Sequence, residues 1–223
     1  MISALVNALA VIVGSLLGIF LKKGIPQRIS DHVMNALGLC TLYIGISGAL
    51  QGSDTLVLII SMVIGAILGT WIDLDLRLNH FGNWLEGRFK GDASISEGFV
   101  TASLLFCVGA MAIVGSLQSG LTGNHEMIFA KSVLDFIAAI IFSSTLGIGV
   151  AFSAMAVFIY QGSIVLLATW IAPLLTETVI GEMTSIGSLI IIALALNILG
   201  ITKLKVMNFV PAIFLPLLLQ LFY

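Results

Sequence analysis

The sequence predicts an all-α fold, a polytopic transmembrane helix bundle of about 8 spans built from tandem two-helix hairpin repeats. Hydrophobic residues make up 59% of the 223 residues, against about 45–50% in globular proteins. Charged residues make up only 9%, where a soluble domain has about 25%. The apolar residues also fall into runs of about 20, the length that a helix needs to cross the hydrocarbon core of a bilayer.

The same composition excludes several classes of protein. Two cysteines are too few for a disulfide-rich secreted scaffold, and a net charge of −2 does not fit a basic protein that binds nucleic acid. The chain is therefore expected to be an integral membrane protein whose partner is the lipid bilayer.

The apolar runs give the spans in order. The first four are expected at residues 2–21, 33–50, 55–72 and 98–117. Residues 132–175 form one run of 44 residues whose only formal charge is Asp135. Because this is twice the length of one span, we divide it near Gly147 and Gly149 into the fifth and sixth spans. The seventh is expected at 183–201 and the eighth at 206–222, interrupted by Pro211 and Pro216.

The basic residues support this number of spans. Cytoplasmic loops of membrane proteins carry an excess of Lys and Arg, and eight of the nine basic residues here fall in odd-numbered loops: Lys22, Lys23, Arg28, Arg77, Arg88, Lys90, Lys203 and Lys205. Only Lys131 falls on the other side. We therefore expect a multi-pass protein with both termini outside. The first span lacks a preceding positive charge, so we interpret it as a retained span rather than a signal peptide.

Two stretches of the sequence match at a fixed offset. Residues 40–51 and 107–118 share Cys, Gly, Leu and Gln at the same spacing, and Val13–Gly18 resembles Ile64–Gly69. We interpret the chain as a single membrane domain, residues 1–223, with tandem parallel repeats at 1–53, 54–120, 121–175 and 176–223. The alternative is that these matches arise by chance, because the sequence consists largely of a few apolar residue types, and this holds especially for the last two repeats.

Glycines recur four residues apart in two of the spans. Gly14 and Gly18 form one G-x-x-x-G pair, and Gly65 and Gly69 form another. Such pairs let helix backbones approach closely inside a membrane. Helix packing is the interpretation we favour, with the lining of a pore as the alternative.

Several long segments of the chain resemble a known family. They are MISALVNALAVIVGSLLG, NALGLCTLYIGISGAL, KSVLDFIAAIIFSSTLGIGVAFSA, YQGSI and LALNILGITKLKVMNFVPAIFLPLL. They are similar to the YqgA/YdfK-like family of bacterial integral membrane proteins, over essentially the whole chain. The resemblance implies a polytopic protein of the bacterial cytoplasmic (inner) membrane and a transporter-like role. It supplies no substrate, mechanism or catalytic residues.

Asp135 is the leading candidate for a functional residue, because an ionisable group inside a span costs about 2.5–3.5 kcal/mol on insertion scales. Lys131 precedes it by four residues, so the two side chains share a helix face. One interpretation is an ion pair at the outer interface, with Lys131 extending toward water. The other is a cation or proton site that faces the interior of the bundle.

Other polar residues are expected to converge near the middle of the membrane. The candidates for a solute- or ion-binding lining are Ser143, Ser144, Thr145, Tyr160 and Gln161, joined by Tyr43 and Ser47, and the lone amides Asn7 and Asn197. Transporters place their binding sites at this depth. Ordinary hydrogen bonds between helices are the alternative for each of them.

The sequence predicts no metal site, no cofactor and no enzyme. His32, His80 and His125 lie in or beside connections without metal-ligand spacing, and the spans hold one carboxylate and no histidine. Cys40 and Cys107 are interpreted as packing residues rather than a disulfide. The acidic residues near the outer helix ends, Glu126, Glu177 and Glu182, are expected to be solvated, with cation attraction as the alternative.

The leading functional hypothesis is a small secondary transporter or channel-like permeation protein for a small solute or ion, with a homo-oligomer as a further expectation. The alternative is a non-transporting scaffold or accessory subunit that docks a partner through the connection 73–97. That connection holds 8 of the 20 charged residues and one apolar face, formed by Leu78, Phe81, Trp84, Leu85 and Phe89. Such amphipathic segments usually lie in the headgroup plane.

Overall fold

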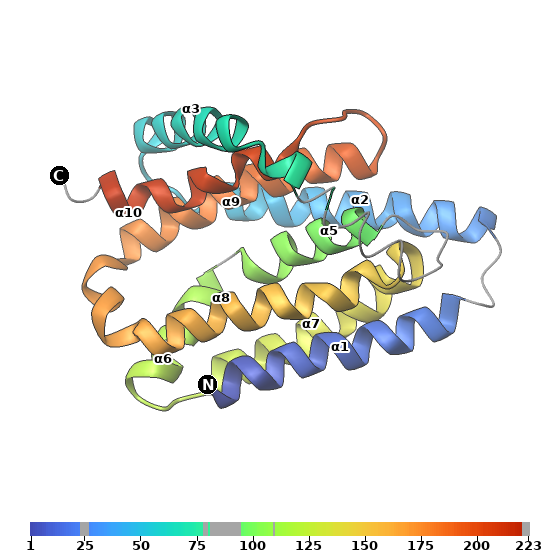
Figure 1. The fold of residues 1–223 in the computed structure, drawn as a ribbon, viewed down its shortest axis with the longest axis horizontal. Helices are drawn as coiled ribbons and strands as arrows, with labels where there is room; N and C mark the ends of the chain where they lie inside the picture. The colour runs from blue at the N-terminus through green and yellow to red at the C-terminus, as the bar shows by residue number, and fades with distance from the viewer. Residues whose placement is uncertain (23–26, 78–79, 81–94, 109, 220–223) are drawn as a thin grey trace. The chain divides into compact units, whose positions relative to one another are not determined.

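The computed structural model describes residues 1–22, 27–77, 80, 95–108 and 110–219. Every element in this part of the chain is a helix (Figure 1). In chain order the elements are α1 (Ile2–Lys22), α2 (Gln27–Ala49), α3 (Thr55–Ile72), α5 (Ile95–Cys107), α6 (Ala110–Leu121), α7 (Glu126–Leu146), α8 (Gly149–Ile171), η1 (Ala172–Leu174), α9 (Glu177–Ile198), η2 (Val206–Phe214) and α10 (Leu215–Leu219). The elements η1 and η2 are 3-10 helices, and the others are α-helices.

The helices confirm the predicted fold class, a polytopic helical bundle. Six described helices are long and apolar enough to cross a membrane, or seven if a bent pair of helices forms one span. The long apolar run is divided where the sequence predicts: α7 ends at Leu146 and α8 begins at Gly149. Gly147 lies between them at φ 73°, a left-handed conformation that glycine adopts without a steric penalty.

The fourth predicted span is not one continuous helix. Instead of one helix over 98–117, the chain forms α5 and then α6, whose residues Met111–Leu121 are bent by 60° relative to α5. A spanning segment with such a break is a broken span or a re-entrant loop. The sequence predicts the apolar segment but not the bend within it, because apolar length alone does not report helix direction.

The eighth predicted span also differs from the expectation. Residues 206–219 form the 3-10 helix η2 followed by the short helix α10, instead of one long α-helix. Pro211 lies inside η2 and Pro216 inside α10, and proline has no backbone N–H to donate within a helix. The described part of this apolar segment, Val206–Leu219, is shorter than the helices that are long enough to cross a membrane.

The chain folds into two compact units that combine distant segments. Unit 1 contains Met1–Val33, His80–Cys107 and Met111–Ile171, and unit 2 contains Met34–Asn79, Val108–Ala110 and Ala172–Tyr223. The tandem repeats remain a prediction from the sequence. The expected basic connections lie partly outside the described residues, which leave out 23–26, 78–79 and 81–94.

Unit 1 is organised around α1, which packs along α7 and α8 (Figure 1). The buried positions of α1 recur every three or four residues, at Ala4, Asn7, Val11, Gly14 and Gly18. This spacing forms one face of a helix. The glycines contact α7: a Cβ atom on Gly14 would lie 2.5 Å from the carbonyl oxygen of Phe136, and one on Gly18 would overlap Ser143 and Ile140.

Unit 2 is organised around α9: 72% of its most apolar 18-residue stretch is buried, against 17% for the corresponding stretch of α3. Small residues on two partner helices allow close contacts here as well. A Cβ atom on Gly48 would overlap the hydroxyl of Ser188 in α9, and the Ser185 hydroxyl donates to the carbonyl of Ala49 at 2.7 Å. Gly65 and Gly69 of α3 face Ala212 and Asn208 of η2.

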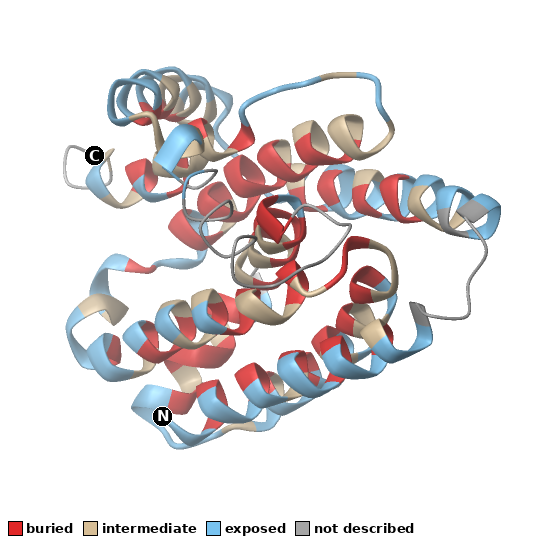
Figure 2. Cartoon of the chain, turned by 45° about the vertical axis from the view of Figure 1, so that its right-hand side comes forward, coloured by how far each residue is buried: buried red, intermediate tan, exposed pale blue. Residues whose placement is uncertain are grey.

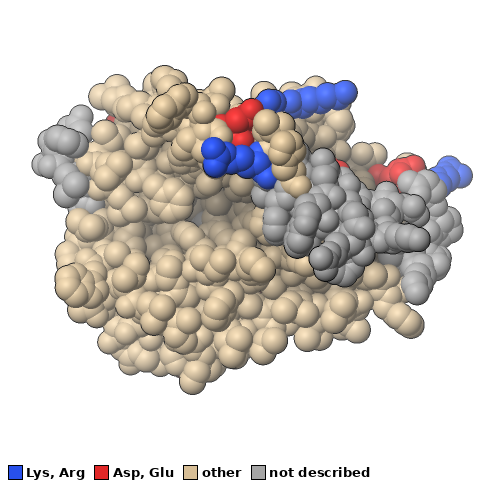
Figure 3. All heavy atoms as spheres, viewed as in Figure 1, with Lys and Arg blue, Asp and Glu red and all other residues tan. Residues whose placement is uncertain are grey.

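The outer faces of the long helices are apolar. Figure 2 shows exposed positions on one side of α1 and buried positions on the other, whereas α9 is buried or half-buried over nearly its whole length. On the face shown in Figure 3 the visible charged side chains are few. Large exposed side chains include Phe20, Trp71 and Trp170, with exposed fractions of 76%, 85% and 80%. A surface of this kind fits contact with lipid rather than water.

We predict opposite effects for two glycine substitutions in unit 1. Gly18→Ala places a methyl group against the Ile140 backbone and the Ser143 hydroxyl, so it should lower the stability by about 1–3 kcal/mol. Gly162→Ala, whose methyl would meet only Met1 at 3.4 Å, should be neutral or slightly stabilising, because alanine favours the helix. Thermal unfolding of the two variants in detergent tests this, and equal melting temperatures would contradict the close contact of α1 with α7.

Candidate functional site

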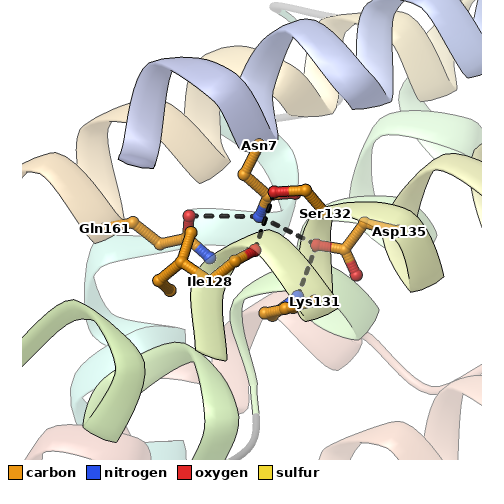
Figure 4. A network of polar contacts seen from close by, with 6 residues as sticks. All are labelled: Asn7, Ile128, Lys131, Ser132, Asp135 and Gln161. Carbon is orange, nitrogen blue, oxygen red and sulfur yellow. Dashed lines mark hydrogen bonds and ion pairs between the residues drawn. The ribbon is translucent and has the colours of Figure 1, made fainter. Parts of the chain in front are cut away.

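A cluster of four polar side chains lies in the apolar interior of unit 1 (Figure 4). Asn7 comes from α1, Lys131 and Asp135 from α7, and Gln161 from α8. Asn7 and Gln161 are fully buried, and each of the two charged residues is 6% exposed. The structure therefore brings together three of the predicted site residues, with Lys131 as the fourth member.

Asp135 Oδ2 is the centre of the cluster. Lys131 forms an ion pair with it from one turn earlier on the same helix. Asn7 Nδ2 donates to the same oxygen at 2.9 Å and to Gln161 Oε1 at 3.1 Å. The four-residue spacing predicts the contact of Lys131 with Asp135, but the pair is buried within unit 1 instead of extending toward water as the interfacial interpretation expected.

Two polar atoms of the cluster have no partner among the described residues. They are Asn7 Oδ1 and Gln161 Nε2, one acceptor and one donor. A buried polar atom without a hydrogen bond costs about 1–3 kcal/mol. Because a buried ion pair is often no more stable than apolar residues of similar volume, stability alone does not account for this cluster.

The first helix of the bent pair, α5, ends beside the cluster. Lys131 Nζ lies 6.0 Å from the ring centroid of Phe106, which is 2% exposed. Phe106 belongs to the last turn of α5, just before the chain bends. The ring face and the negative end of a helix dipole both favour a cation at this position.

A second polar chain reaches α1 from the start of α7. Ser119 in α6 shares a hydrogen bond of 2.5 Å with Ser3 Oγ and one of 2.9 Å with His125 Nδ1. His125 is half-buried and precedes α7, while Ser3 is fully buried one turn before Asn7. The sequence did not single out Ser3 or Ser119, because a serine in an apolar helix carries no signal until its partner is known.

The remaining candidates in unit 1 do not contact the cluster. Ser143, Ser144 and Thr145 donate to carbonyl groups one turn earlier in their own helix, at 3.3, 2.7 and 2.9 Å. Ser143 lies eight residues beyond Asp135, about 12 Å along the helix axis. Tyr160 is half-buried on α8, and it is the adjacent Gln161 that enters the cluster.

Three candidates belong to unit 2 and have other surroundings. Tyr43 and Ser47 are exposed on α2. Asn197 accepts hydrogen bonds from Thr202 and the Leu204 N–H at 2.7 and 2.9 Å, and donates to the Leu204 carbonyl at 2.8 Å. Asn197 thus fixes the turn after α9 instead of bonding a neighbouring helix.

Glu182 is not solvated as expected but 3% exposed. The seventh span was predicted to begin at Met183, whereas α9 begins at Glu177, which places Glu182 inside the helix. Thr176 caps α9 by accepting from the Val179 N–H at 3.3 Å. A threonine before an apolar helix indicates where the helix begins. A helix that begins after Thr176 includes Glu182.

Comparison with known proteins gives consistent matches over nearly the whole chain. Residues 2–221 match the family model described as "Protein of unknown function (DUF554)". The chain is 34% identical over 220 residues to the "Uncharacterized membrane protein YdfK" of Bacillus subtilis (strain 168), covering 97% of this chain and 94% of the relative. It is 30% identical over 222 residues to the "Uncharacterized protein YqgA" of Escherichia coli (strain K12), with the same coverage. No solved structure matches the chain significantly.

We predict that the ion pair of the cluster is replaceable only as a pair. Lys131→Met leaves Asp135 buried without its cation and should destabilise the protein by about 3–5 kcal/mol. Adding Asp135→Val should restore stability to near the wild-type value. Thermal or denaturant unfolding of both variants in detergent measures this. A double variant as unstable as the single one would show that Lys131 acts mainly through its packing on Phe106.

Proposed function

The chain belongs to the DUF554 family and is a membrane protein, and from this we propose that it is a small secondary transporter or channel-like permeation protein for a small solute or ion. The observation that carries the proposal is the buried cluster of Asn7, Lys131, Asp135 and Gln161. Ionisable residues inside membrane spans are rare, face the bundle interior, and mark solute or ion pathways.

The surroundings of the cluster support the same proposal. Within the bent pair, α5 ends beside Lys131 and α6 follows after the bend, and discontinuous helices are typical of transporter binding sites. The hydrogen-bonded chain of His125, Ser119 and Ser3 leads from a half-buried position to the residue one turn before Asn7. Polar side chains would thus line the path of a solute from His125 toward the cluster.

The contacts suggest how a small cation would be handled. Lys131 neutralises Asp135 at Oδ2, so a cation that reaches this oxygen has to displace the lysine ammonium. While the ion pair is open, Asn7 Oδ1 would be free to accept a hydrogen bond and Gln161 Nε2 would be free to donate one. In this proposal the pair is the gate of the pathway, and the protein binds and releases without covalent chemistry, as expected for a protein that is not an enzyme.

We also propose the location and orientation. The resemblance to bacterial inner-membrane proteins supports the cytoplasmic membrane, and the distribution of Lys and Arg supports termini on the outer side. The competing proposal is a scaffold that docks a partner through the connection 73–97. Residues 78–79 and 81–94 of that connection lie outside the described part of the chain.

We predict that permeation depends on the ion pair even where folding does not. In proteoliposomes the wild type should dissipate an imposed gradient of H⁺, Na⁺ or K⁺, measured with ion-sensitive dyes. The Lys131→Met, Asp135→Val double variant should lose about 10-fold or more of this flux, while its melting temperature remains near that of the wild type.

A matched control removes an exposed ion pair instead. Lys205 and Asp73 lie 3.9 Å apart with side chains 63% and 40% exposed. Lys205→Gln with Asp73→Asn removes the same two charges and should leave the flux unchanged. Full flux in the buried double variant contradicts the gate. If the wild type moves none of the three ions and no small solute, the scaffold proposal is favoured.

We predict that the C-terminus is outside, on the same side as the N-terminus, which requires an even number of crossings: the bent pair and the short segment 206–219 either both cross the membrane or both do not. Alkaline phosphatase fused after residue 223 should then be active in a bacterial host, and green fluorescent protein fused there should be dark. The opposite result would indicate an odd number of crossings, in which only one of the two crosses, either the bent pair or η2 with α10.

A further inference from the structure

A pocket of about 350 Å³ lies in unit 2, beside the first turns of α3 and α9. Asp54 and Val57 line it from α3 and its N-cap, and Thr178 and Glu182 from α9. Asp54 and Thr178 are exposed, whereas Glu182 is buried. The pocket therefore joins an accessible carboxylate to a buried one.

Glu182 has one saturated and one unpartnered oxygen. Its Oε1 accepts three hydrogen bonds, from the Ser53 N–H at 2.6 Å, the Ser53 hydroxyl at 3.1 Å and the Asp54 N–H at 2.8 Å. These bonds hold the carboxyl group in a single orientation. Its Oε2 is buried without a hydrogen-bond partner among the described residues, so an acceptor is left in a residue that lines the pocket.

Among the described residues that line the pocket, the charges are all negative: Asp54 and Glu182 are the ionisable ones, and none of the described lining residues is Lys or Arg. Asp54 Oδ1 accepts from the N–H groups of Leu56 and Val57 at 2.8 and 3.2 Å, so it already occupies the positive end of the α3 dipole. The pocket therefore favours a cation over an anion.

The remaining lining and the volume indicate the size of that cation. Val57, Val179, Pro216 and Leu219 form an apolar part of the wall. A volume of about 350 Å³ fits a small organic molecule, since ligand pockets span about 300–1,000 Å³. A bare metal ion would need about six oxygen ligands in a much smaller space.

We propose that this pocket binds a small organic cation, a protonated amine with a short apolar body. The ammonium group donates to Glu182 Oε2 in a charge-assisted hydrogen bond, and the apolar body contacts Val57, Val179, Pro216 and Leu219. All of its residues belong to unit 2, so the binding does not depend on the ion pair of unit 1 or on permeation through it.

The test uses the purified full chain in nanodiscs of zwitterionic lipid, with n-butylammonium chloride as the probe. Isothermal titration should give saturable binding in the millimolar range or tighter. Glu182→Gln keeps the shape of the side chain and removes its charge, and should weaken binding by about 10-fold or more. Glu177→Gln, the same change at an exposed position outside the pocket, should leave binding unchanged.

Asp54→Asn provides a second variant, because asparagine caps a helix as well as aspartate does. It should also weaken binding, and it carries the test if Glu182→Gln does not fold. Butyrate and 1-butanol serve as the anionic and neutral probes of the same length. The proposal is overturned by the absence of saturable butylammonium binding, by equal binding of 1-butanol or butyrate, or by unchanged binding in folded Glu182→Gln. Binding of sodium chloride without butylammonium binding would overturn it in favour of a metal-ion site.

Discussion

The close approach of α1 to α7 is the contact on which the candidate site in unit 1 depends. Gly14 and Gly18 have no side chain to separate the two backbones, and the Phe136 and Ile140 carbonyls take the space. Asn7 lies two turns before Gly14 on the same face of α1, so the spacing fixed by the glycines extends to its amide. That spacing lets Asn7 Nδ2 reach Asp135 at 2.9 Å. Inside a bilayer, where burial from water supplies no attraction between helices, packing of this kind determines which polar groups meet.

Much of the fold follows from the length of the apolar runs. A bilayer sets the length of a span, so the limits of α1 and α3 are readable from hydropathy, and Gly147 marks the boundary between α7 and α8, although α7 begins six residues before the predicted run and α8 ends four residues before its end. The bend after Cys107 and the 3-10 helix at 206–214 are not readable in the same way. Both depend on how a short helix packs against its neighbours, which is a tertiary property.

The site could be predicted only as far as local geometry extends. Four-residue spacing on one helix predicts the contact of Lys131 with Asp135. Asn7 and Gln161 are separated from each other by 154 positions, so their contact depends on the packing of α1 against α8. The hydroxyls of Ser144 and Thr145 looked equally suitable, but a hydroxyl in a helix can bond the carbonyl one turn earlier and needs no partner from another helix.

Two buried carboxylates in one chain illustrate why burial alone does not define a site. Asp135 has a cation on its own helix, so its charge is compensated inside the unit and a ligand has to compete with Lys131. Glu182 is held by two backbone N–H groups and a hydroxyl, which carry no full positive charge, and its second oxygen has no partner among the described residues. A carboxylate that is already paired with a lysine suits the exchange of a cation, because the ion pair can open to admit the cation and close again after its release. An uncompensated carboxylate beside a pocket suits retention of a cation, because the ligand supplies the missing charge.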